Sequence, residues 1–154
     1  MTKDKASTSR QSVVPYMCVK EAGKALDFYV RAFGAKEAFR LTEPGSGRIG
    51  HAEFAIGTSR LMISDEYPDF GALSPQSVGG SPIKLHVAVD DCDGFVAKAV
   101  AAGATVLRPP KDQFFGERNA MVMDPFGHGW FISQRIEEVT PAEMQRRWAT
   151  AFET

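Results

Sequence analysis

Two histidines and a glutamate occupy positions from which strand alternation would bring them to one side of a sheet. His51 and Glu53 stand two residues apart in the segment HAEFAIG, so both side chains leave the same face of a strand. Histidine titrates near neutral pH and a carboxylate can orient its ring, so the two residues can form an acid–base pair or bind a metal ion. They also suit a solvated strand edge, which is the interpretation that we favour from spacing alone.

The second histidine, His86, lies in another apolar segment, IKLHVAV. The larger aliphatic side chains alternate with it and should face a helix, so His86 points to the opposite side. The same alternation in VVPYMCV predicts that Tyr16 also points away from its helix. Four polar residues are therefore predicted to face one shared cavity: His86, Glu53, His51 and Tyr16. Of these, His86, Glu53 and His51 are the candidate catalytic residues. A hydrogen-bonded strand residue without a functional role is the alternative interpretation of His86.

The remaining walls of this cavity are expected to be mostly apolar with few polar groups, as is common in small-molecule pockets. The predicted lining residues are Met62, Ser64, Phe114, Phe115, Trp130 and Phe131. Arg118 can clamp a ligand anion through its planar guanidinium, or it is an ordinary surface arginine. His128, in the turn DPFGHGW, is expected to brace that turn.

An internal repeat supplies the elements that must position these side chains. The pair Gly34-Ala35 recurs as Gly103-Ala104, 69 positions later, and each pair ends an apolar helical segment. A short apolar strand precedes each helix, and three further strands follow it. The first set of three is predicted near 36–41, 50–56 and 60–65, and the second near 105–108, 118–123 and 129–134. The chain is therefore predicted to have an α+β fold made of two tandem βαβββ modules.

The modules are predicted to span residues 13–66 and 82–135. The other predicted segments are a disordered N-terminal tail at 1–12, a linker or lid at 67–81 and a C-terminal helical region at 136–154. The C-terminal helix begins with a capping box from Thr140 to Glu143. Its apolar positions Met144, Trp148 and Phe152 recur every four residues and are expected to pack on the parent chain, with a partner subunit as the alternative.

Composition and charge exclude several classes of protein. The 154 residues carry 18 basic and 19 acidic side chains, a net charge of −1, which gives no reason to expect binding to nucleic acid or to an anionic membrane. No apolar run is long enough to cross a bilayer, and the first ten residues lack the apolar centre of a secretory signal. The two cysteines, Cys18 and Cys92, are expected to be plain buried thiols. We therefore expect a cytoplasmic protein.

Three segments resemble the vicinal oxygen chelate superfamily, which includes glyoxalases, bleomycin-resistance proteins and extradiol dioxygenases. They are DFYVRAFGA in the first half and LHVAVDD and DPFGHGW in the second. The resemblance covers about residues 13–135 and is closest to the bacterial branch labelled glyoxalase-like. It implies a curved mixed-sheet half-barrel. It also implies a homodimer, because in many members two halves or two chains complete one another.

In the metal-using members of this superfamily, the first and last strands of each half contribute His or Glu ligands. The resemblance places His86 at one ligand position. The other positions fall on Val14 or Tyr16, on Met62 or Ser64, and on Phe131, and these residues do not match. A divalent ion needs several nitrogen or oxygen donors, so we predict no metal and no cofactor. A displaced site made of His51, Glu53 and His86 is geometrically conceivable.

Three functional hypotheses follow. The leading one is metal-independent binding or sequestration of a small aromatic or amphipathic molecule in the apolar cavity. The alternative is a metal-dependent lyase, isomerase or dioxygenase with Glu53 or His51 as the base. The third is an interaction module that depends on the C-terminal helix. The sequence identifies neither the ligand nor whether a reaction is catalysed.

Overall fold

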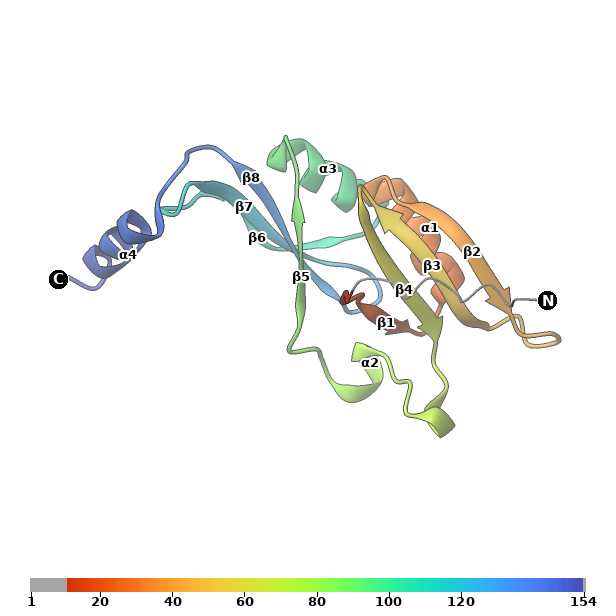
Figure 1. Cartoon of the computed structure of the whole chain (residues 1–154). Coiled ribbons are helices and arrows are strands. Elements are labelled where there is room, and N and C mark those ends of the chain that lie inside the picture. The colour runs from red at the N-terminus through yellow and green to blue at the C-terminus, as the bar shows by residue number, and fades with distance from the viewer. Residues whose placement is uncertain (1–10, 154) are drawn as a thin grey trace, which may run out of the picture.

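Two strand–helix–three-strand modules follow one another along the chain in a computed structural model that describes residues 11–153 (Figure 1). The first module consists of β1 (Tyr16–Val19), α1 (Ala22–Phe33), β2 (Lys36–Thr42), β3 (Ile49–Ile56) and β4 (Ser59–Asp65). The second consists of β5 (Lys84–Ala88), α3 (Cys92–Ala102), β6 (Thr105–Asp112), β7 (Glu117–Met123) and β8 (Gly129–Arg135). Residues 1–10 of the predicted N-terminal tail lie outside the described residues.

Each module forms its own four-stranded mixed sheet. The strand orders are β1-β4-β3-β2 and β5-β8-β7-β6, and in both sheets the first strand pairs in parallel with the last while the other pairs are antiparallel. The fold is therefore α+β with two equivalent sheets, as the repeat predicts, and the sheets do not close into a barrel. The strand β6 is longer than predicted because its register shifts carry it past Pro109 and Pro110, which an edge strand tolerates.

The helices α1 and α3 pack against each other and join the two modules. Gly34 ends α1 in the left-handed conformation, at a φ of 68°, which a residue without Cβ adopts at little cost. The side chain of Asp91 caps α3 by accepting a hydrogen bond from the backbone N–H of Gly94 at 3.1 Å. The predicted helix boundaries at these two positions are confirmed.

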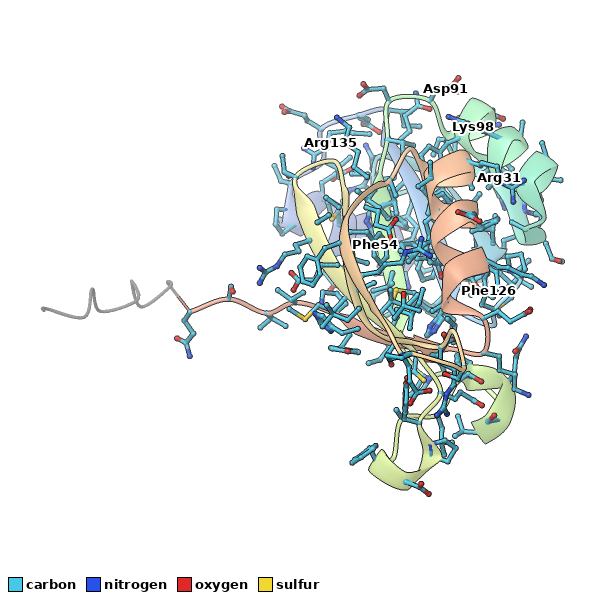
Figure 2. The ribbon with its side chains drawn as sticks, turned by 90° about the vertical axis from the view of Figure 1, so that its right-hand side faces the viewer. Arg31, Phe54, Asp91, Lys98, Phe126 and Arg135 are labelled. Carbon is cyan, nitrogen blue, oxygen red and sulfur yellow. The ribbon has the colours of Figure 1, made fainter. Side chains whose placement is uncertain are left out.

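Aromatic side chains fill the space between the helices and the sheets. The rings of Tyr29 and Phe54 stack with centroids 5.3 Å apart, and Phe33 meets Trp130 edge-on at 4.7 Å. Figure 2 shows Phe54 between the first sheet and α1, whereas Arg31 of α1 and Lys98 of α3 are exposed. This shared core fixes the two modules relative to each other.

The connection between the modules is ordered. It contains a 3-10 turn, η1 (Pro68–Phe70), and the short helix α2 (Pro75–Val78). Glu66 accepts hydrogen bonds from the backbone N–H of Ser74, at 2.8 Å, and from the hydroxyl groups of Ser74 and Ser77. These bonds hold α2 to the end of β4.

The C-terminal helix α4 (Pro141–Thr150) extends away from the rest of the molecule (Figure 1). Thr140 caps it as predicted, accepting from the backbone N–H of Glu143 at 3.2 Å. The expectation that its apolar side packs on the parent chain is wrong for the described residues, because α4 packs on no other helix or strand there. The rings of Trp148 and Phe152 meet edge-on, and the two residues are 51% and 69% exposed. No helix within residues 11–153 is long and apolar enough to cross a membrane.

Candidate functional site

The face of the first sheet that points away from α1, which we call the first open face, carries three of the predicted polar residues. Burial follows the predicted alternation: Met17, Val19, Ala52 and Phe54 are buried on the helix side. The side chains between them, those of Tyr16, His51 and Glu53, therefore lie on the opposite side. Phe39 and Leu41 of β2 pair with Glu53 and His51 and share this face.

A continuous chain of polar contacts crosses the first open face. The hydroxyl oxygen of Tyr16 lies 2.7 Å from His51 Nδ1, and His51 Nε2 lies 3.1 Å from Glu53 Oε2. The other carboxylate oxygen of Glu53 is 3.5 Å from a guanidinium nitrogen of Arg60. Exposure changes along this chain, from a mostly buried Glu53 side chain at 15% to Tyr16 at 54%. The phenol is thus the end that a ligand can reach.

The partners of His51 define its tautomer. A carboxylate only accepts hydrogen bonds, so Nε2 carries the proton and donates it to Glu53, and Nδ1 is left to accept from the Tyr16 hydroxyl. Partial burial raises the pKa of Tyr16, the charge of Glu53 raises it further, and Ser64 lowers it. Because the net shift is upward, the phenol stays protonated and acts as the donor.

The corresponding face of the second sheet, which we call the second open face, has a different arrangement. His86 is 52% exposed, and its Nε2 lies 3.9 Å from Glu117 Oε2. That carboxylate oxygen already accepts a hydrogen bond from the hydroxyl of Ser133. Glu117 is not among the residues predicted from the sequence. Its strand alternation was a usable signal, because Asn119 pairs with Ser133 on the face of His86 and Glu117 stands two residues before it in β7.

A groove of about 920 Å³ runs between the modules. Its apolar walls come from both modules, and its polar rim includes Arg60 and His86. The apolar residues that line it include Phe33, Ile56, Leu61, Leu85, Val87, Phe95 and Trp130. A second hollow, of about 320 Å³, lies on the second open face beside Glu117 and Ser133, and His86 lines both. Arg60 lines the groove and also pairs with Glu53, so it connects the groove to the polar chain of the first open face.

The structure divides the predicted site residues among several places. Tyr16, His51 and Glu53 come together, but His86 is on the other sheet, so the four polar candidates do not form one hydrogen-bonded group. Met62 pairs with Tyr16 and Ser64 with Cys18 along β4, and Phe131 pairs with His86 along β8. Trp130 is 1% exposed and belongs mainly to the core.

The predicted residues at the other end of the second module lie away from the groove. Arg118 forms ion pairs with Asp93 at 2.6 Å and Asp112 at 2.9 Å, so its guanidinium is already occupied. Phe114 and Phe115 meet edge-on between β6 and β7, and the carbonyl of Phe114 accepts from Arg147 of α4. These contacts fix the β6–β7 loop and the base of α4.

The third histidine, His128, has a structural role, but its ring does not brace its own turn as expected. His128 Nε2 donates to the backbone carbonyl of Cys18 at 3.0 Å, which links the last turn of the second module to β1. Its own turn is held by Asp124, which accepts from the backbone N–H groups of Phe126 and His128. The turn thus serves the contact between the modules.

The side chains that the structure describes do not provide a set of ligands for a divalent ion. Within residues 11–153 no three histidine, cysteine, aspartate or glutamate side chains gather closely enough to hold one. The strand positions that would supply ligands carry a tyrosine, a methionine, a serine and a phenylalanine beside His86. A divalent ion requires several nitrogen or oxygen donors in a suitable geometry, so this donor set does not fit such an ion.

Comparison with known proteins assigns the chain to a family by its sequence. The model of the Glyoxalase/Bleomycin resistance protein/Dioxygenase superfamily matches residues 12–132. The Mycobacterium bovis protein Mb0911c is 39% identical over 134 residues, which cover 85% of this chain and 88% of that protein. The Arabidopsis thaliana protein At5g48480 is 26% identical over 129 residues, covering 79% of this chain and 76% of that protein.

Solved structures share the arrangement of the two modules. TioX from Micromonospora sp. ML1 superposes with a TM-score of 0.62 at 26% identity, covering 84% of this chain and all of that chain. PA1353 from Pseudomonas aeruginosa superposes with a TM-score of 0.67 at 23% identity, covering 82% of this chain and 98% of that one. At 23% identity, the likeness to PA1353 concerns the fold alone.

Proposed function

Because the chain belongs to the Glyoxalase/Bleomycin resistance protein/Dioxygenase superfamily, we propose that it binds a small aromatic or amphipathic molecule in the groove between its modules. The observation that carries this proposal is the groove itself, with a volume of about 920 Å³ and walls that include Leu85 and Phe95. Pockets of this size with mainly apolar walls and a few polar groups are typical of small-molecule sites. Arg60 and His86 supply those polar groups and would orient an amphipathic ligand.

This binding does not depend on a resident metal ion. The donor set does not suit such an ion, since among the described residues His86 is the one histidine at a strand position from which metal-using relatives bind their ion. Glu117 lies near it, but at 3.9 Å from His86 and with its oxygen bonded to Ser133 it forms a polar pair and not a chelate. The ligand is therefore held by apolar contact, hydrogen bonds and the Arg60 charge.

A second copy of the chain is the partner that we propose for the exposed apolar surfaces. Large apolar side chains remain exposed on β6, on α4 and just after α4: Val106, Leu107, Trp148 and Phe152. Clustered exposed apolar side chains often mark a protein–protein contact. A symmetric dimer would cover these side chains with the same surfaces of the other copy.

The two free cysteines suit the reducing conditions of the cytoplasm, where we place the protein.

A variant that fills the groove tests the binding proposal. Ala88 lines the groove and is exposed, so Ala88→Trp occupies its space without disturbing the core. The matched control is Ala97→Trp on α3, an exposed alanine that does not line the groove. With the amphipathic dye 1-anilinonaphthalene-8-sulfonate as the probe, we expect at least a tenfold weaker affinity for Ala88→Trp alone. Equal affinities of the two variants and the original protein would refute the groove as the site.

A further inference from the structure

We propose that Tyr16, His51 and Glu53 form a proton relay that accepts the proton of an acidic hydroxyl group, a phenol or an enol, on a flat ligand at the first open face. The inference rests on the proposed small-molecule function. It adds a reactive position on the first open face, which Arg60 connects to the groove. It requires no metal ion, and the residues that carry it are joined by two hydrogen bonds, of 2.7 and 3.1 Å.

The order of the hydrogen bonds gives the relay its direction. Glu53 holds the proton on Nε2 of His51, so Nδ1 presents its lone pair to the Tyr16 hydroxyl. The oxygen of Tyr16 donates its own proton to His51 and keeps lone pairs for a second donor. A ligand hydroxyl is that donor, since Tyr16 is the exposed end of the chain of contacts.

The surroundings of Tyr16 fit a flat apolar ligand. The ring of Phe39 lies 5.7 Å from that of His51, and Met62 stands beside Tyr16 in the neighbouring strand. These side chains offer contact to an aromatic or enolic ring system, while Arg60 supplies positive charge on the same sheet. The charged or titratable groups that we place around the relay are Lys36 from β2, Cys18 from β1, and Arg60 from β4.

The step balances without an oxidant or a co-reactant. The O–H bond of the ligand breaks, its electron pair stays on the ligand oxygen, and its proton bonds to the Tyr16 oxygen. The proton that Tyr16 carried bonds to Nδ1 of His51, which becomes an imidazolium paired with Glu53. Transfer is favourable only when the ligand hydroxyl has a pKa near that of an imidazole, so the expected class is electron-poor phenols and stabilised enols.

The fold does not require this arrangement, because the second module forms the same sheet without it. Ala52 pairs with Ile63 as Ala120 pairs with Ile132, so Asn119 and Met121 hold the places of His51 and Glu53. Likewise His86, which pairs with Phe131, holds the place of Tyr16, which pairs with Met62. One of two equivalent sheets thus carries the relay, which points to a chemical role and not a structural one.

The test uses p-nitrophenol, whose visible absorbance reports its ionisation and whose pKa is near neutrality, and its methyl ether p-nitroanisole, which has no proton to give. For the original protein we expect the apparent pKa of bound p-nitrophenol to fall by about one unit or more. Tyr16→Phe and His51→Gln should abolish this shift while still binding p-nitroanisole. Tyr67→Phe, the same change at a tyrosine outside the relay, should keep it.

The outcomes separate the relay from the binding proposal. If p-nitrophenol binds but its ionisation is the same in the original protein, Tyr16→Phe and His51→Gln, the relay is refuted and the binding function stands. If the original protein binds neither compound at the first open face, the relay fails, whereas the binding proposal fails only if Ala88→Trp also leaves dye binding in the groove unchanged. A shift that survives His51→Gln but not Tyr16→Phe would contradict the role of His51 as the proton acceptor.

Discussion

The carboxylate of Asp124 holds four donors and is buried between the modules. Its two oxygens accept from the hydroxyl of Tyr29 at 2.6 Å, from the indole N–H of Trp130 at 2.9 Å and from two backbone N–H groups. Burial and the charge of Asp124 raise the pKa of Tyr29 well above its usual value, so Tyr29 remains a donor. Asp124 thus holds Trp130, which lines the groove, in place through the hydrogen bond from its indole N–H.

Replacing Asp124 by alanine should destabilise the whole protein. The change leaves the buried hydroxyl of Tyr29 and the indole N–H of Trp130 without an acceptor, and the loss of such bonds to a charged group costs about 3 kcal/mol or more. Urea unfolding should show this loss in the free energy of unfolding. Asp69→Ala, at an exposed position in η1, is the control and should change little. A loss below about 1 kcal/mol for Asp124→Ala would contradict the role assigned to it.

The pH dependence of stability should reveal the link at Glu66. Hydrogen bonds from Ser74 and Ser77 lower the pKa of Glu66 from 4.5 to about 2. A carboxyl group with a lowered pKa in the folded state stabilises the fold above its unfolded pKa, and this contribution is lost as pH falls from about 4.5 toward 2. Glu66→Gln should remove part of the loss of stability over that range in acid titrations. Identical acid profiles for Glu66→Gln and the original protein would show that the bonds do not stabilise the linker.

At the scale of secondary structure elements, the helix α4 stands apart from the modules. Thr140→Ala removes its cap and should destabilise the helix by about 1 kcal/mol. Because α4 packs on no other described element, hydrogen exchange should quicken in α4 and stay unchanged in the two modules. Equal loss of protection in β7 or β8 would show that α4 is coupled to the sheets.

The sequence predicts the elements well because their signals are local. The glycines that end α1 and α3, the alternation in β3 and the cap of α4 are each readable within a few residues. The position of α4 is not, since the pattern of Met144, Trp148 and Phe152 shows that a face is apolar but not what covers it. The contact between His86 and Glu117 was missed for a similar reason, because it joins strands 31 positions apart in sequence. Likewise, the alternation put Tyr16, His51 and Glu53 on one face but could not give the order of their hydrogen bonds.

At the scale of the whole molecule, the exposed apolar surfaces predict association. Light scattering after size-exclusion chromatography should give about twice the chain mass of 16.8 kDa. A double variant that places charge on β6 and on α4, Leu107→Asp with Trp148→Asp, should shift the protein toward the single-chain mass. A mass near 16.8 kDa for the original protein at all concentrations would contradict the dimer.

We propose that the groove between the modules holds a small organic molecule without the help of a metal ion. Native mass spectrometry of chelator-treated protein mixed with 1-anilinonaphthalene-8-sulfonate, with Ala88→Trp measured in parallel, is the sharpest test of this binding. The predicted spectrum shows one bound dye per chain and no mass of a divalent ion, and the dye peak is lost in Ala88→Trp. A dye peak that appears only after a divalent ion is restored, at one ion per chain, would contradict the claim.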